Sequence, residues 1–136
     1  VIFTANQTVN SKREAIYHTN VMMCLAETFA VICLGSIDDK KERKNVLKHL
    51  KEDGKKVIEI SEEQVASFAG NMLQVRGTDN ELFLVMSQAA YDSLTTSQIA
   101  QINNHCKIIS SSLDTIEACG GGSARCMMAE VFLPKI

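Results

Sequence analysis

Residues 28–60 read TFAVICLGSIDDKKERKNVLKHLKEDGKKVIEI, and this stretch decides the fold class. Residues 28–34 are almost wholly apolar, which is typical of a strand buried on both faces. Residues 38–53 predict a helix, because two aspartates suit its start, an apolar stripe runs along it and Gly54 follows its end. Residues 56–60 predict another strand, so the stretch is typical of an α/β protein.

The order of elements in this stretch occurs twice in the chain. A strand predicted at residues 15–26 completes a ββαβ unit over residues 15–60, and elements predicted across residues 71–110 repeat it. Polar or reactive groups mark the first strands at intervals of about 55 residues: His18 with Asn20, then Asn71, then Cys126 at the start of a strand predicted at 126–133. Repeats of fixed period build closed or stacked folds that need several units. The chain is therefore expected to be about half of a larger fold.

Length and composition limit the classes of protein to which the chain can belong. With 136 residues it is expected to be a single domain portion over residues 1–136. Fourteen basic and sixteen acidic residues leave a net charge of −2, which predicts no binding to nucleic acid. The longest apolar stretch, residues 21–34, is interrupted by Glu27 and Thr28 and is shorter than the ~20 residues of a spanning helix, so no membrane segment is expected.

The five cysteines form no C-x-x-C pair and no zinc-like spacing with the three histidines, so neither a metal nor a cofactor is expected. An odd number of cysteines in a chain without a signal-peptide pattern indicates reduced thiols and a cytoplasmic protein. The sequence opens at Val1 inside an apolar run, without an initiator methionine, which indicates a cut within a longer chain or a processed one.

One cysteine differs from the others in its surroundings. Residues 120–128 read GGGSARCMM, and three glycines allow the backbone to approach a ligand closely. A cysteine directly after such a loop can be held partly exposed at a cleft, where Arg125 or a cation of the substrate would favour the thiolate, the nucleophilic form. The alternative is a flexible surface loop in which Cys126 merely fills the core.

A second motif, YHTNVMM at residues 17–23, places polar groups beside an apolar run. On a strand His18 and Asn20 would point to the same face, where they need hydrogen-bond partners or a wet cleft. The alternative is a hydrogen-bonded buried histidine. Together, a histidine on a strand and a cysteine after a glycine loop meet the first requirement for a Cys–His catalytic pair.

Three motifs in combination carry a family resemblance: YHTNVMM at 17–23, FAGN at 68–71, and the glycine loop with CMMAEVF at 126–132. They resemble the C-terminal half of the guanidine-modifying (pentein) superfamily, which contains arginine deiminases, dimethylarginine dimethylaminohydrolases and amidinotransferases. Within that group the first and last motifs are most similar to citrulline-utilisation-type hydrolases. The resemblance implies an α/β propeller of five ββαβ units, of which this chain would supply about half, the C-terminal portion.

The resemblance also implies a mechanism. Cys126 would be the nucleophile that attacks the central carbon of a guanidino or ureido group, and His18 would be the general acid and base. The substrate would be a small arginine- or citrulline-like molecule, and the family's carboxylates come largely from the missing N-terminal half. We expect the substrate-binding residues to be Asn20, Asn71, Gly121, Gly122 and Arg125.

The sequence departs from the family in one informative way. Members of the family often have an aspartate two residues after the catalytic histidine, where this chain has Asn20. An amide donates as well as accepts, so the exchange favours a neutral ureido group or weakens the grip on a cation.

The alternatives to a hydrolase are an amidinotransferase and a non-catalytic propeller-type binding or assembly module. We also expect the chain to pair with its missing half or with itself, because its isolated units leave a sheet edge uncovered.

Overall fold

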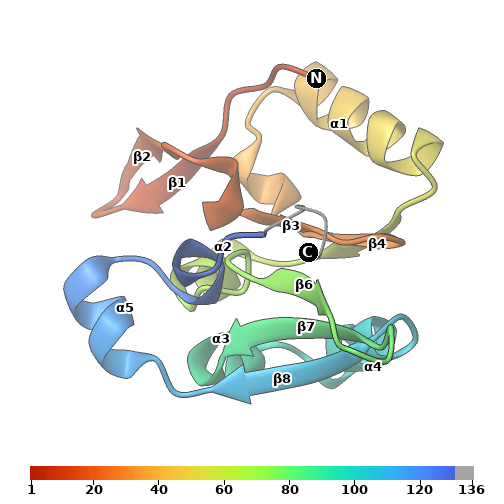
Figure 1. Cartoon of the computed structure of the whole chain (residues 1–136). Coiled ribbons are helices and arrows are strands. Elements are labelled where there is room, and N and C mark those ends of the chain that lie inside the picture. Colours follow the sequence, from red (N-terminus) through yellow and green to blue (C-terminus); the bar gives the residue numbers. More distant parts are fainter. Residues whose placement is uncertain (131–136) are drawn as a thin grey trace.

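The computed structural model describes residues 1–130, which contain two three-stranded sheets and one hairpin (Figure 1). The first sheet has the order β3 (Met23–Leu25), β4 (Phe29–Ile32) and β5 (Lys56–Glu59), with helix α1 (Lys40–Glu52) between β4 and β5. The second sheet has the order β6 (Leu73–Arg76), β7 (Leu82–Ser87) and β8 (Lys107–Ser111), and helices α3 (Gln88–Ser93) and α4 (Thr96–Asn103) connect β7 to β8. In each sheet the first pair is antiparallel and the second parallel, which confirms the two predicted ββαβ units.

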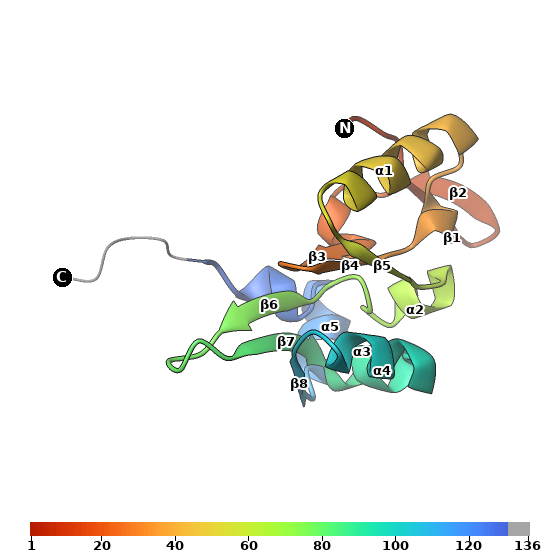
Figure 2. The ribbon, with the colours of Figure 1, turned by 90° about the vertical axis from the view of Figure 1, so that its right-hand side faces the viewer.

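The two units pack against each other through their first strands and through a helix. Strand β3 contacts β6, and α4 contacts both β5 and β8. Helix α1 covers the outer side of the first sheet, while α3 and α4 lie beside the second (Figure 2). Residues 1–130 form two successive units of an open mixed α/β fold and do not close a ring, so the complete five-unit propeller stays a prediction.

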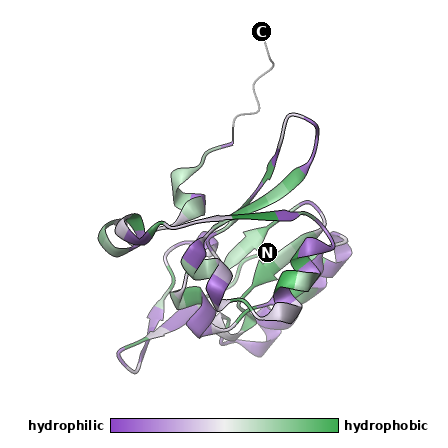
Figure 3. Ribbon diagram, turned by 90° about the horizontal axis from the view of Figure 1, so that it is seen from below, coloured by the Kyte–Doolittle hydropathy of each residue, from purple (hydrophilic) through white to green (hydrophobic). Residues whose placement is uncertain are grey.

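The core follows the apolar pattern of the strands. All four residues of β4 are buried, and β5 and β7 contribute Ile58, Leu84 and Met86. Hydrophilic residues lie mainly on the helices and the hairpin, whereas the strands of the two three-stranded sheets are largely hydrophobic (Figure 3). Within residues 1–130, none of the helices has the length and apolar character that crossing a membrane would require.

Two capping boxes join the units. Ser61 caps α2 (Glu62–Ala66) and Thr95 caps α4, and in each case the side-chain oxygen of a glutamine three residues later accepts the backbone N–H of the cap residue. These glutamines, Gln64 and Gln98, donate to each other's side-chain oxygen at 2.8 and 3.0 Å. The two capping boxes therefore also serve as a contact between the units.

The hairpin of β1 (Asn6–Val9) and β2 (Lys12–Ala15) precedes the first unit. Its two-residue turn has positive φ at Asn10 (48°) and Ser11 (64°), as a type I′ turn requires. Arg13 fastens the hairpin to the first unit through ion pairs with Asp38 at 2.6 Å and with Glu62. Residues 1–5, within the apolar run that opens the sequence, do not form a strand.

The first parts of two predicted strands form 3-10 turns in the structure, so those two predictions are wrong there. Residues 15–26 are not one strand, because Thr19–Val21 form a 3-10 turn, η1, and β3 begins only at Met23. His18 caps this turn with its side chain, and such local hydrogen bonds compete with an extended backbone. A 3-10 turn, η3 (Ala124–Met127), likewise replaces the start of the strand predicted at 126–133, whose residues 131–133 lie outside the described residues.

Candidate active site

The side chain of Asn71 joins three segments that are far apart in the sequence. Its amide Nδ2 donates to the backbone oxygen of Asn20 at 3.0 Å and to the Cys126 sulfur at 3.2 Å. Its Oδ1 accepts the Ser123 backbone N–H at 3.2 Å, and its backbone oxygen accepts that of Arg125 at 3.3 Å. The turn after His18 and the loop that carries Cys126 therefore meet at the side chain of Asn71.

The turn that carries Asn71 depends on its neighbours. Gly70 lies against η1, where an added Cβ would be 2.3 Å from the Val21 backbone oxygen and 2.8 Å from Met22 backbone atoms. Phe68 has a positive φ of 64°, and its oxygen accepts the Asn71 N–H at 2.8 Å. A left-handed non-glycine residue is strained, and the absence of a side chain at Gly70 is what permits the close approach.

The glycine loop holds Cys126 at close quarters. Gly121 ends helix α5 (Asp114–Gly120) with a φ of 65°, the left-handed conformation that glycine adopts without strain. A Cβ on Gly122 would lie 3.0 Å from the Cys126 Cβ and 3.1 Å from its sulfur. We predicted that these glycines let the backbone approach a ligand, and in the structure Gly122 lies close to the side chain of Cys126.

Ser123 anchors the loop from two sides. It is fully buried, its N–H donates to Asn71, and its hydroxyl donates to Glu117 Oε1 on α5 at 2.6 Å. The Cys126 N–H donates back to the Ser123 oxygen at 3.1 Å. Sequence analysis missed Ser123 and Glu117, and the only available signal was a small polar residue directly after three glycines.

His18 lies on the other side of the Asn20 backbone. Its extended backbone places the imidazole so that Nδ1 accepts the Asn20 N–H at 3.1 Å. A nitrogen that accepts carries no proton, so this contact places the proton of the neutral ring on Nε2. The side chain is exposed, and within residues 1–130 no hydrogen bond joins it to Cys126.

The predicted site residues line two pockets rather than one. Asn71, Gly121, Gly122 and Cys126 line a pocket of about 180 Å³, which Tyr17 and Phe68 also border. His18, Asn20 and Arg125 line one of about 240 Å³ that also contains Glu130. The Asn71–Asn20 hydrogen bond connects the two sets of residues.

Arg125 is engaged inside the second pocket. Its guanidinium donates to the Met128 backbone oxygen at 2.9 Å and pairs with Glu130 at 3.5 Å. Among the described residues it makes no hydrogen bond to the Cys126 sulfur, so the role predicted for it, favouring the thiolate, has no direct contact here.

The other cysteines differ from Cys126 in exposure. Cys24, Cys33 and Cys106 are buried, and burial raises the pKa of Cys24 to about 12. Burial also raises the pKa of Cys106, so both thiols stay protonated at neutral pH. Only Cys119 and Cys126 are exposed, and Cys126 alone of these two lines a pocket with predicted site residues.

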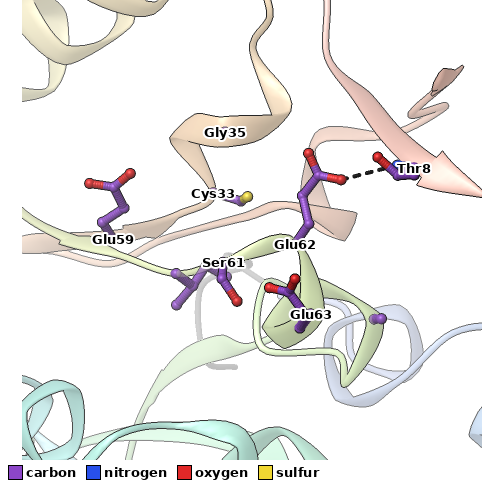
Figure 4. A pocket seen from close by; sticks show the side chains of 9 residues that line it. Thr8, Cys33, Gly35, Glu59, Ser61, Glu62 and Glu63 are labelled. Atoms are coloured by element: carbon purple, nitrogen blue, oxygen red, sulfur yellow. Dashed lines mark hydrogen bonds between the residues drawn. The ribbon is translucent and has the colours of Figure 1, made fainter. Parts of the chain in front are cut away.

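A further pocket of about 680 Å³ lies at the ends of β4 and β5, outside the site (Figure 4). Cys33, Glu59, Glu62 and Glu63 line it, and the Thr8 N–H donates to Glu62 at 3.1 Å. None of the predicted site residues belongs to it. Across residues 1–130 no group of three or more His, Cys, Asp or Glu side chains is arranged to hold a metal ion.

Comparison with known proteins gives one family and several solved structures. The model of a family described as eukaryotic N,N dimethylarginine dimethylhydrolase matches residues 1–133. No curated protein matches the sequence. The crystal structure of AgrE with ornithine and NAD⁺ has a TM-score of 0.63 at 20% identity, and it covers 89% of this chain and 16% of its own.

Other neighbours include forms of ArgZ, an arginine dihydrolase from the ornithine–ammonia cycle in cyanobacteria. The apo structure gives a TM-score of 0.61 at 18% identity, covering 82% of this chain and 15% of its own. The product-bound N-terminal domain gives 0.56 at 19%, covering 82% of this chain and 36% of the domain. The chain thus has their fold and spans little more than a third of that domain.

Proposed function

Because the chain belongs to the eukaryotic N,N dimethylarginine dimethylhydrolase family, and with it to the guanidine-modifying superfamily, we propose that it supplies the nucleophile of a cysteine-dependent hydrolase. The enzyme cleaves a C–N bond in a guanidino or ureido group of an arginine- or citrulline-like substrate. The observation that carries the proposal is the exposed Cys126 sulfur, which lies beside Gly122 and accepts a hydrogen bond from Asn71.

In the first half-reaction the Cys126 thiolate attacks the central carbon of the substrate, and a C–S bond forms. His18 acts in its imidazolium form, in which Nδ1 is protonated and no longer accepts the Asn20 N–H. It donates its Nε2 proton to the departing amine as the C–N bond breaks, which leaves an amidino or carbamoyl thioester and a neutral imidazole. In the second half-reaction water, deprotonated by His18, attacks the same carbon and releases the thiolate. A guanidino substrate then yields a ureido product and one amine.

The remainder of the fold must complete this site. Neither pocket encloses His18 and Cys126 together, and the chain spans 36% of the ArgZ N-terminal domain. By resemblance to the family, we assign to the missing portion the carboxylates that hold the substrate's nitrogens and orient His18. A carboxylate at Nδ1 of His18 would need a proton there, so it would replace the hydrogen bond from the Asn20 N–H.

The test uses the complete protein with dimethylarginine, arginine and citrulline as substrates and chloroacetamidine as a covalent probe. We expect the probe to label Cys126 and to abolish turnover, and we expect Cys126→Ser to be inactive. Cys119→Ser, which changes the other exposed thiol, should keep full activity and full labelling. Turnover by Cys126→Ser, or equal labelling of both exposed thiols, contradicts the nucleophile assignment. Amine release without an added acceptor amine distinguishes a hydrolase from an amidinotransferase.

A further inference from the structure

We propose that Asn71 is a positioning residue that holds the Cys126 sulfur and the His18 turn in one hydrogen-bonded assembly and favours the thiolate form of Cys126. The inference rests on the proposed function in one respect only, because it takes Cys126 to be the reacting thiol. It replaces the expected role of Asn71 in binding substrate with a role inside the protein.

A count of donors and acceptors supports this role. A primary amide has two N–H donors and one carbonyl oxygen. The Nδ2 group of Asn71 contacts two acceptors, Asn20 O and Cys126 Sγ, while Oδ1 accepts from Ser123. Asn71 is only 4% exposed. No N–H of this side chain is left to meet a substrate.

The contact with sulfur has a direction. A neutral thiol sulfur is a weak acceptor, whereas a hydrogen bond to an ionised group is about twice as strong as one between neutral groups. The amide N–H therefore stabilises the thiolate more than the thiol. Asn71 is buried and Cys126 is exposed, so the sulfur accepts a hydrogen bond from the protein interior while it remains accessible from solvent.

The same nitrogen also fixes the histidine. Asn71 Nδ2 holds the Asn20 oxygen, and the N–H of Asn20 holds His18 Nδ1. Nucleophile and general acid are thus separated by one side-chain amide and one backbone residue. Removing that amide should therefore loosen the positions of both Cys126 and His18, although neither would lose a contact with substrate.

The experiment measures the rate of Cys126 alkylation by iodoacetamide against pH in the complete protein, with Cys119→Ser as the background. Asn71→Leu removes both donors at similar size. We expect the pH at half-maximal rate to rise by about one unit, so that labelling at neutral pH slows about tenfold, while the rate at high pH is unchanged. Asn71→Asp keeps the acceptor for Ser123 and adds a negative charge, so it should shift the midpoint further.

Glu117→Ala is the matched control, because it removes the partner of the Ser123 hydroxyl and leaves the Asn71–sulfur contact in place. A merely structural role for Asn71 predicts that its variants behave like Glu117→Ala, with an unmoved midpoint. That result in a folded Asn71→Leu or Asn71→Asp protein would overturn the inference. Failure of the proposed function has a separate sign, since the midpoint would still shift but wild-type protein would turn over no guanidino or ureido substrate.

Discussion

At Gly70, backbone atoms of Val21 and Met22 occupy the space that a side chain would need. An added Cβ would approach the Val21 oxygen to 2.3 Å, and backbone atoms cannot rotate away as a side chain can. We expect Gly70→Ala to destabilise the fold by about 1–3 kcal/mol, the range for overpacked sites, and to separate Asn71 from η1. Gly120→Ala is the control, because nothing lies within 4 Å of its Cβ position. Equal thermal unfolding midpoints for the two variants would contradict this reading of Gly70.

Asn20 lies in the pocket with His18, Arg125 and Glu130, where a carboxylate would add negative charge. A charge-assisted contact to a guanidinium is stronger than a neutral hydrogen bond, while a ureido oxygen needs an N–H donor. We expect the complete enzyme to prefer citrulline-like substrates over arginine, and Asn20→Asp to shift the ratio of kcat/KM values toward arginine. A wild-type preference for arginine, or a ratio that stays constant in the variant, would show that Asn20 does not read substrate charge.

At the scale of elements, the β1–β2 hairpin depends on one arginine. Hydrogen bonds from Arg13 and then Asn6 hold the pKa of Asp38 below its usual range. Burial acts to raise the pKa of Glu62, but hydrogen bonds from Arg13 and Thr8 outweigh it and leave that pKa lowered. Hydrogen bonds to Asp38 and Glu62 raise the pKa of Arg13 itself.

These directions set the pH dependence of the hairpin. Carboxylates with a lowered pKa in the folded state contribute stability above their unfolded pKa, about 4, and lose it as the pH falls through the folded value. We expect the protection factors of the amides in β1 and β2, the exchange rates of the unfolded chain divided by those of the folded protein, to fall below about pH 4. Arg13→Gln should exchange faster already at neutral pH and change little on acidification. Lys48→Gln, in the exposed pair with Glu52, is the control and should follow wild type.

The elements that the sequence could predict are those whose apolar residues follow one regular pattern along the element. Strand β4 and helix α1 follow from an apolar run and an amphipathic stripe, and the repeat spacing marked His18, Asn71 and Cys126 as matching positions of successive units. The turn η1 could not be foreseen, because the apolar run after Asn20 favours a strand while the His18 cap acts locally. The contact of Ser123 with Asn71 is tertiary, and that of Ser123 with Glu117 crosses the end of α5, so neither leaves a periodic pattern in the sequence.

On the scale of the whole molecule, several large apolar side chains near the site are exposed, which is unusual for a surface that no other part of the protein covers. Tyr17 is 81% exposed, Leu25 55% and Met127 47%, and Tyr17 and Leu25 each border one of the two site pockets. Together with the short span of the chain on its structural neighbours, this supports docking of the missing portion of the fold on this side.

We therefore expect the 136-residue chain alone to self-associate at micromolar concentration, and to form a one-to-one complex when the missing portion is supplied. Sedimentation velocity measures both states. Tyr17→Ser with Leu25→Ser should weaken association, whereas Ile109→Ser, an exposed apolar residue on β8, serves as the control. A monomer that neither self-associates nor binds the missing portion would count against a composite site.

The long reach of the Asn71–Cys126 hydrogen bond has a consequence for how the protein is made. Each sheet closes within its own unit, as when Phe29 pairs with Lys56, but this bond spans 55 residues. Translation runs from the N-terminus, and segments with nearby partners fold first. Both sheets can be complete before residue 126 leaves the ribosome. The Cys126 thiol then docks against an Asn71 turn that is already folded, so the contact between Asn71 and Cys126 forms only after both sheets.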